Sequence, residues 1–347
     1  MNLIKGKKMI VLGLAAVTLL GATLVNNQNI ASAGSKETLV PVHETLVKKY
    51  KIISPRIGYN TKTGYIQIDG QDAFKAKKSA NGNSYVAPET IKAAVEKIKK
   101  SEKKLTFVLV HGAWADASFF DETAAELRQQ GHTVYVPEYP GHGSLKDMKN
   151  ATHEQMTNAV ADYIKKKNLT NIVLLGHSFG GTIIAKVSEQ IPERISRLVF
   201  FDAFVPLDGE SLADQLPAPV QQSFAKLAED SKDGTIMLPF PLFREAFANT
   251  ASLEEAKAMY ANISPEPAGP LVQKLNLKKF YSLQIPKSYL YLTEDNVLPQ
   301  NEDFSWHPKQ SGRLGFFRYI EGRGDHMTTV HKEPEEIAEK FVQAGRE

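Results

Sequence analysis

The sequence predicts an α/β fold: a mostly parallel sheet with helices on both of its faces. Short apolar runs alternate with helical patterns from residue 105 to the C-terminus. These runs lack a regular polar face, which is typical of parallel strands buried on both sides. Alternation of strands and helices favours a doubly covered sheet over a bundle or a sandwich.

The expected elements follow one another in a regular order. Strands are predicted at 105–110, 133–136, 172–175, 198–204, 287–293 and 315–320. Helices are predicted at 119–130, 154–167, 182–189 and 335–342, where apolar residues recur at helical spacing. Gly131 ends the first of these helices.

One segment interrupts this order, at residues 207–282. It contains several helical stretches, and its apolar run at 237–243 includes two prolines, which excludes a central strand. An insertion of this length between two strands is too long for a plain loop. We therefore expect a helical cap over the end of the sheet.

The first 33 residues resemble a secretory signal. Lysines at 5, 7 and 8 precede an apolar run at 9–25, and Ala31-Ser32-Ala33 has the small residues of a cleavage site. We predict cleavage after Ala33 and a secreted or cell-envelope protein. An uncleaved N-terminal anchor is the alternative, because the apolar run is at the short limit of a membrane span.

Residues 34–104 form a basic extension with 15 Lys/Arg against 7 Asp/Glu, whereas residues 105–347 carry a net charge of −8. A strand is expected at 64–68, closed by the hairpin-type pair Asp69-Gly70, and a lysine-rich helix begins at Pro88. The extension is interpreted as a solvated linker or as an arm for an anionic cell wall or membrane. Alternatively, its strand pairs with an edge of the main sheet.

Composition excludes several kinds of site. The chain has no cysteine, so disulfides, thiolate metal sites and a cysteine nucleophile are ruled out. The sequence also lacks a recognisable metal-ligand cluster or phosphate-binding loop, and we predict no cofactor and no metal. The acidic body argues against a nucleic-acid partner.

The chemistry is expected at Gly176-His177-Ser178-Phe179-Gly180, a G-x-S-x-G motif between a predicted strand and a predicted helix. In that context the motif predicts a nucleophile elbow, a sharp turn that exposes the serine. Ser178 is therefore the candidate nucleophile.

Serine needs a base, and the expected base follows the last strand. His326 occupies that place, with His331 as the alternative. The remaining histidines of the body are assigned to turn motifs (His111, His142 and His177) or to exposed positions (His132, His153 and His307).

The acid that orients His326 should follow a strand between the serine and the histidine. Asp295 follows the penultimate strand and is favoured, with Glu294 and Asp202 as alternatives. An oxyanion hole is expected from the backbone amides of Phe179 and Ala113, the latter in the loop after the first core strand.

The segments around His111-Gly112-Ala113-Trp114, Gly176–Gly181, Thr293–Asp295 and Gly324–Met327 resemble the α/β-hydrolase superfamily. More narrowly they resemble its branch of plant methyl-ester esterases, hydroxynitrile lyases and bacterial carboxylesterases. The resemblance covers about residues 105–345. It implies an α/β-hydrolase fold, a cap at about 207–282, and a substrate pocket lined by residues that include Gly112, Trp114 and Met327.

The resemblance leaves two chemistries and a binding role open. Lyases of the branch typically have a lysine after the catalytic histidine and a threonine after the first-loop histidine. This chain has Met327 and Gly112 there, which favours an esterase for small or medium apolar esters. Lyase or lactonase activity on the same triad, and a slowly reacting ligand-binding protein, are the alternatives.

Overall fold

The structure, a computed structural model, describes residues 57–60, 65–68, 71–75, 77–78, 84–85 and 103–346. The chain divides into two compact units, residues 1–103 and 104–347. The predicted signal segment and the helix expected from Pro88 lie outside the described residues. Among the described residues, no helix is both long and apolar enough to cross a membrane.

The N-terminal unit contains two small antiparallel sheets. Strands β1 (Ile57–Asn60), β2 (Tyr65–Ile68) and β3 (Gln71–Lys75) form one, and β4 (Lys77–Lys78) pairs with β5 (Ser84–Tyr85) in the other. The strand predicted at 64–68 is confirmed as β2. It lies between β1 and β3 and pairs with both. The alternative, in which this strand pairs with an edge of the main sheet, is therefore wrong, because β1 and β3 already pair with the two edges of β2.

The C-terminal unit is built on a six-stranded sheet in which every neighbouring pair is parallel, as predicted. The strands lie in the order β13-β12-β9-β8-β6-β7. Their bounds are β6 Thr106–Val110, β7 Thr133–Tyr135, β8 Ile172–His177, β9 Ile195–Phe201, β12 Lys287–Leu292 and β13 Arg318–Gly322.

β9 and β13 differ most from their expected bounds, and backbone geometry explains one end of each. β9 ends at Phe201 because Asp202 has a φ of +36°, which is outside the range of extended chain. β13 begins at Arg318 because Gly315 has a φ of +73° and so lies in a turn. Apolar content alone does not reveal either change of direction.

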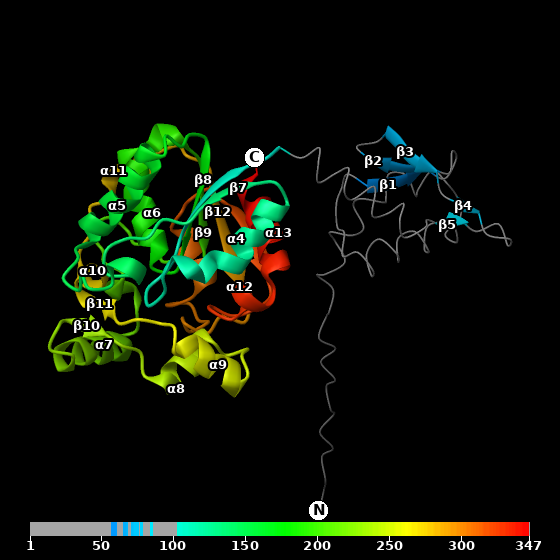
Figure 1. Cartoon of the computed structure of the whole chain (residues 1–347). Helices are drawn as coiled ribbons and strands as arrows, with labels where there is room; N and C mark the ends of the chain where they lie inside the picture. Colours follow the sequence, from blue (N-terminus) through cyan, green and yellow to red (C-terminus); the bar gives the residue numbers. More distant parts are fainter. Residues whose placement is uncertain are drawn as a thin grey trace, which may run out of the picture. The chain divides into compact units, whose positions relative to one another are not determined.

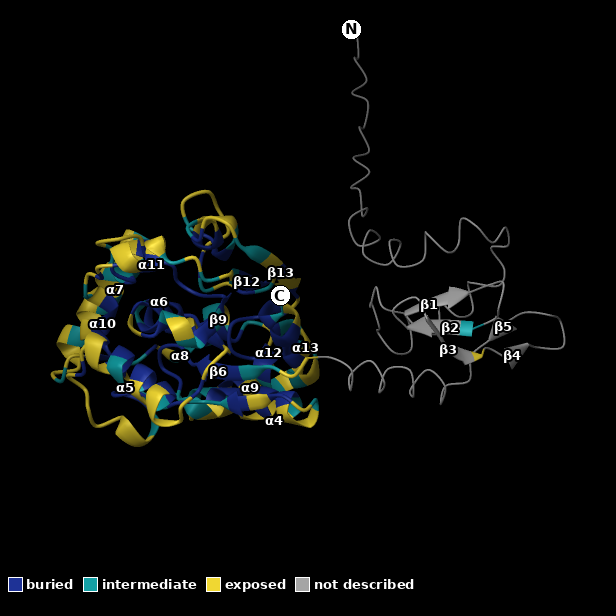
Figure 2. Cartoon of the chain, turned by 90° about the horizontal axis from the view of Figure 1, so that it is seen from above, coloured by how far each residue is buried: buried dark blue, intermediate teal, exposed yellow. Residues whose placement is uncertain are grey.

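Helices cover both faces of the sheet (Figure 1). One face carries α4 (Asp121–Gln129), α12 (Thr329–Lys332) and α13 (Pro334–Gly345). The other carries α5 (His153–Lys166), α6 (Gly180–Gln190) and α11 (Lys278–Ser282). Figure 2 shows buried strands in the middle of this unit and exposed outer helix faces, the pattern of a core enclosed between two helical layers.

The segment at 207–282 contains several short helices and two short strands, joined by turns. It contains α7 (Ala218–Asp230), β10 (Thr235–Ile236), α8 (Phe240–Leu242), a π-helical turn (Phe243–Phe247), α9 (Leu253–Tyr260), β11 (Glu266–Pro267), α10 (Ala268–Val272) and α11. β10 and β11 pair as a two-stranded antiparallel ribbon. From α7 to α9 the segment lies beyond one end of the sheet (Figure 1), whereas α11 packs against α6. We call residues 207–277, which exclude α11, the cap.

The sheet brings two loops together beside its centre. From β6 the chain moves outward to β7 and then returns to β8 on the other side of β6. Val110 at the end of β6 pairs with Gly176 near the end of β8, so the segments that follow them are neighbours. Ligands of open α/β sheets bind at such a reversal point.

Candidate active site

Ser178 occupies a strained turn between β8 and α6. Its φ is +53°, in the left-handed region that non-glycine residues seldom adopt. Glycines on both sides make the turn possible: a Cβ on Gly176 would lie 2.4 Å from the Gly180 carbonyl oxygen, and one on Gly180 would lie 2.6 Å from that of His111. The turn thus has the close backbone approach that a nucleophile elbow requires.

His326 and Asp295 come from the loops that follow β13 and β12. Nδ1 of His326 lies 2.5 Å from Oδ2 of Asp295, and both side chains are almost completely buried. The other carboxylate oxygen, Oδ1, accepts a hydrogen bond from the amide of Val297 at 2.9 Å. The carboxylate is therefore fixed, and with Nδ1 engaged, Nε2 is the ring nitrogen left for proton exchange.

The two other acids considered from the sequence lie differently. Glu294 faces Arg323, whose Nε is 3.0 Å from its carboxylate, at the half-exposed edge of the loop. Asp202 is fully buried after β9, where both of its carboxylate oxygens accept the amide hydrogen of Leu292 at 3.1 and 3.2 Å. Burial, together with the negative charge of Asp295, raises the pKa of Asp202 well above its usual value. Of the three acids, Asp295 is the one that bonds to His326.

Three groups in this cluster could offer ligands to a metal ion. One donor atom each from Asp202, Asp295 and His326 lies within 4.8 Å of the others. These atoms already have partners, however, since His326 bonds to Asp295 and Asp202 accepts the Leu292 amide. A cation would have to break the bond between His326 and Asp295, so the donor set suits proton sharing better than metal binding.

The loop after β6 lies directly against the nucleophile. A Cβ on Gly112 would be 2.8 Å from the Cβ of Ser178, so only glycine fits there. The amides of Ala113 and Phe179, the expected oxyanion donors, make no hydrogen bond to any other residue in the described part of the chain. Both residues are buried. Two such unused N–H donors beside a serine are what an oxyanion hole needs.

Aromatic rings enclose His326. Its ring stacks on Trp306 with centroids 5.5 Å apart and meets the edge of Phe247, also at 5.5 Å. Phe247 belongs to the cap and also packs against Trp114 at 5.6 Å, while its carbonyl accepts the amide hydrogen of Met327 at 2.9 Å. Trp114 and Met327, expected to line the pocket, thus meet the same cap residue. Sequence reasoning missed Phe247 and Trp306, because no motif or periodicity marks them.

His177, inside the G-x-S-x-G motif, packs against the base. Its ring lies 4.4 Å from that of His326 and stacks on Phe119 at 4.7 Å. Burial lowers the pKa of His177 well below its usual value, and the neighbouring His326 acts in the same direction. His177 therefore stays uncharged at neutral pH and does not compete with His326 as a base.

Two histidines expected at exposed positions are buried, which corrects that prediction. Nδ1 of His132 accepts the amide hydrogen of Leu105 at 3.1 Å, and Nε2 of His153 lies 2.9 Å from the hydroxyl of Thr182. Burial lowers the pKa of His153 to about 3. Hydrogen bonds to buried partners offset the free-energy cost of removing these rings from water. His307, the third histidine expected at an exposed position, is half-buried and packs against Tyr319. His331, the alternative base, lies at the surface and bonds to Glu122.

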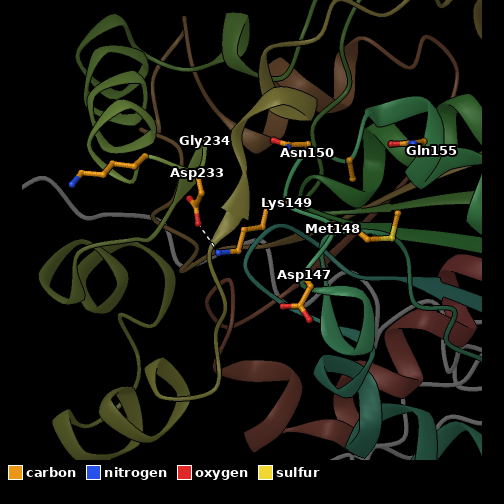
Figure 3. Close-up of a pocket in the computed structure, with 9 residues that line it drawn as sticks. Asp147, Met148, Lys149, Asn150, Gln155, Asp233 and Gly234 are labelled. Atoms are coloured by element: carbon orange, nitrogen blue, oxygen red, sulfur yellow. Dashed lines mark hydrogen bonds and ion pairs between the residues drawn. The ribbon is translucent and has the colours of Figure 1, made fainter.

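A depression of about 600 Å³ lies elsewhere on the same unit (Figure 3). The loop 147–151 and the turn 232–234 line it, and Lys149 pairs with Asp233 across it at 2.5 Å. None of the candidate site residues contributes to its walls. It is an open polar surface, separate from the buried cluster around His326.

Comparison with known proteins places this geometry in a family context. Residues 107–340 match the model of the Alpha/beta hydrolase family. Over 113 residues, 32% of this chain and 47% of the relative, the chain is 42% identical to the Carbendazim hydrolyzing esterase of Nocardioides sp. (strain SG-4G). Over 205 residues, 56% of this chain and 53% of the relative, it is 25% identical to Putative methylesterase 11, chloroplastic, of Arabidopsis thaliana. The chain thus spans about half the length of these curated relatives.

A solved structure matches more completely. The extracellular alpha/beta-hydrolase from a Paenibacillus species is 62% identical, with a TM-score of 0.69. The match covers 70% of this chain and 100% of that one. That hydrolase is described as sharing structural and functional homology with Tobacco Salicylic Acid Binding Protein 2.

Proposed function

The chain belongs to the α/β-hydrolase family, and on that premise we propose that it is a serine carboxylesterase for small or medium apolar esters. Ser178 is the nucleophile, His326 the base and Asp295 the acid of the triad. The observation that carries this proposal is the buried 2.5 Å contact between His326 Nδ1 and Asp295 Oδ2. It fixes the tautomer of a histidine whose loop lies at the same edge of the sheet as the Ser178 turn.

The mechanism has two halves. Ser178 Oγ attacks the ester carbonyl carbon while His326 Nε2 takes the hydroxyl proton, and the carbonyl oxygen becomes an oxyanion that accepts hydrogen bonds from the amides of Ala113 and Phe179. The intermediate collapses, and the alkoxide leaves with the proton from His326. Water then attacks the acyl-enzyme with His326 again as base, which releases the carboxylic acid and restores Ser178. Throughout, the carboxylate of Asp295 stabilises the imidazolium.

The proposed substrate class rests on the surroundings of the triad. Phe247 and Trp306 pack against His326, Met327 follows it in the chain, and Trp114 packs against Phe247. All four side chains are buried. Relatives named for ester hydrolysis, a carbendazim-hydrolysing esterase and a putative methylesterase, support the same chemistry. Because aromatic and thioether side chains favour apolar ligands, we expect the acyl or alcohol group to be uncharged.

The proposed location is outside the cytoplasm. The basic and apolar segments at residues 1–33, with the small residues 31–33, support export with cleavage after Ala33. The similar Paenibacillus hydrolase is extracellular, which agrees with this proposal. Residues 34–104 would then face the cell envelope, where their excess of lysine suits an anionic wall or membrane surface.

A chain-length series of p-nitrophenyl esters, from acetate to palmitate, tests the function on protein that begins at residue 34. We expect hydrolysis with a maximum at short or medium acyl chains, and covalent labelling of Ser178 by a fluorophosphonate, located by peptide mass. Ser178→Ala should lose both, with a rate loss on the order of 10⁶. The exposed Ser282→Ala is the matched control and should keep both.

Two results would contradict the proposal. Hydrolysis that survives in Ser178→Ala would remove this serine from the mechanism. Tight binding of an ester with negligible turnover in the wild-type protein would instead indicate a ligand-binding role.

A further inference from the structure

The cap holds the backbone of Trp114, the residue that follows the proposed oxyanion donor Ala113. The amide of Trp114 donates to Oε2 of Glu266 at 2.9 Å, and its carbonyl accepts the amide hydrogen of Ser264 at 3.1 Å. Its indole Nε1 donates to the carbonyl of Ile236 at 2.7 Å. All three polar groups of Trp114 are thus bound by residues of the β10–β11 ribbon or the segment just before β11.

Trp114 needs such restraint because its backbone is strained. Its φ is +60°, a left-handed value that is unfavourable for a bulky residue. Strained residues of this kind persist only where their surroundings impose them. The peptide plane between residues 113 and 114 therefore depends on Glu266, which binds the N–H of that plane.

Glu266 is itself held by an ion pair. It is fully buried on β11, opposite Ile236, and Oε2 lies 2.7 Å from Nε2 of His142. Nδ1 of His142 lies 3.2 Å from the carbonyl oxygen of Pro140, so both ring nitrogens face oxygen acceptors. The Pro140 carbonyl can only accept, so Nδ1 carries a hydrogen. Burial lowers the pKa of His142, but the charge of Glu266 and the hydrogen bond to it outweigh burial and raise that pKa, which favours the imidazolium. Oε1 of Glu266 has no partner among the described residues.

We propose that Glu266 is a positioning residue for catalysis, which fixes the loop 112–114 so that the amide of Ala113 points at the developing oxyanion. The inference rests on the proposed esterase function. Glu266 touches neither the candidate triad nor, by this argument, the substrate. It acts through Trp114, and the contact with His142 orients its carboxylate. The cap is thereby part of the oxyanion hole as well as a cover over the site.

The role predicts a kinetic signature that separates positioning from substrate binding. An oxyanion donor acts on the transition state more than on the ground state, so its misplacement lowers kcat and leaves KM nearly unchanged. A displacement of about 1 Å at such a site costs on the order of 10²-fold in rate. A residue that only shaped the pocket would change KM instead.

Two variants test this on protein that begins at residue 34. Glu266→Ala removes the acceptor for Trp114, and we expect kcat to fall on the order of 10²-fold with KM within about threefold. Glu266→Gln keeps an oxygen acceptor without the charge, and we expect an intermediate kcat. Glu229→Gln, an exposed carboxylate on α7 in the same cap, is the matched control and should behave as wild type.

A second readout does not depend on turnover. A trifluoromethyl ketone adds to the serine as a hemiketal oxyanion, whereas the corresponding secondary alcohol has no carbonyl group and forms none. Affinity for the ketone should fall in Glu266→Gln by about the same factor as kcat, and affinity for the alcohol should not. If Glu266→Ala does not fold, Glu266→Gln and this pair of ligands decide the question alone.

The outcomes distinguish the two proposals. Wild-type kcat in a folded Glu266→Ala, or equal loss of ketone and alcohol affinity in Glu266→Gln, would overturn the positioning role while leaving the esterase intact. A wild-type protein that neither hydrolyses esters nor labels at Ser178 would contradict the esterase and this inference with it.

Discussion

Asp202 and Asp295 place two buried carboxyl groups side by side at the ends of neighbouring strands, yet only Asp295 bonds to His326. Burial and the charge of Asp295 raise the pKa of Asp202 well above its usual value, which favours its protonated form. A protonated Asp202 avoids repulsion from the negative charge of Asp295, the acid that contacts His326.

The first prediction compares the two acids. Asp295→Asn should lower kcat by roughly 10⁴, because an amide at this place favours the wrong tautomer of His326. Asp202→Asn should change kcat only a few-fold, because an amide resembles the neutral acid in shape and still accepts the Leu292 amide hydrogen. Ester hydrolysis at a fixed pH measures both. The opposite ranking would transfer the role of triad acid to Asp202.

The second prediction concerns stability and pH. An acid whose folded pKa is raised contributes stability that is present below its unfolded pKa, about 4, and is lost as pH rises toward the folded value. Asp202→Asn removes this dependence. The melting temperature of Asp202→Asn relative to wild type should therefore increase steadily as the pH rises above about 4. A difference that stays constant over this range would show that Asp202 does not hold its proton on folding.

The third prediction uses the contact between the first loop and the nucleophile. In Gly112→Ala the new Cβ would lie 2.8 Å from the Cβ of Ser178, so the loop must move away. We expect kcat to fall on the order of 10²-fold and stability to drop by about 1–3 kcal/mol from overpacking.

Gly269→Ala on α10 is the matched control for Gly112→Ala. A Cβ there has no heavy atom within 4 Å, so this variant should match wild type in kcat and melting temperature. Kinetics and thermal unfolding of both variants check the pair. Normal kcat in Gly112→Ala would mean that the loop has more freedom than the structure indicates.

Much of the fold was predictable because its strands are buried on both faces. In a chain whose apolar runs alternate with helical patterns, a continuous apolar run such as 172–175 predicts a strand buried on both faces. The end of β9 was not predictable, because it depends on the positive φ of Asp202, which no composition rule reveals. The buried places of His132 and His153 were missed for a related reason: their hydrogen-bond partners come from other segments of the chain.

Part of the candidate site was likewise predictable from the sequence, and part was not. Ser178, Asp295 and His326 follow from a local motif and from chain order, and the contact between the last two agrees with that order. Phe247, Trp306 and Glu266 were not found. Glu266 is 152 positions from Trp114 in the sequence, and it belongs to a two-residue strand that no sequence pattern indicates. Contacts between a cap and a sheet depend on packing, which a single sequence does not specify.

The last prediction concerns the basic extension. Residues 34–104 carry a net charge of +8 and residues 105–347 a net charge of −8, while the candidate triad lies wholly in the second part. Protein that begins at residue 34 should adsorb to vesicles containing anionic lipid at low salt. Adsorption should disappear toward 1 M salt, where the screening length falls to about 3 Å. Protein that begins at residue 104, where the second compact unit starts, should hydrolyse esters at the same rate and should not adsorb.

Vesicles of uncharged lipid are the control for both proteins, and Lys77→Glu with Lys78→Glu in the longer protein should weaken adsorption without deleting the segment. Equal adsorption of the long and short proteins at low salt would show that the extension is not an electrostatic tether, and an insoluble short protein would show that the extension is needed for folding.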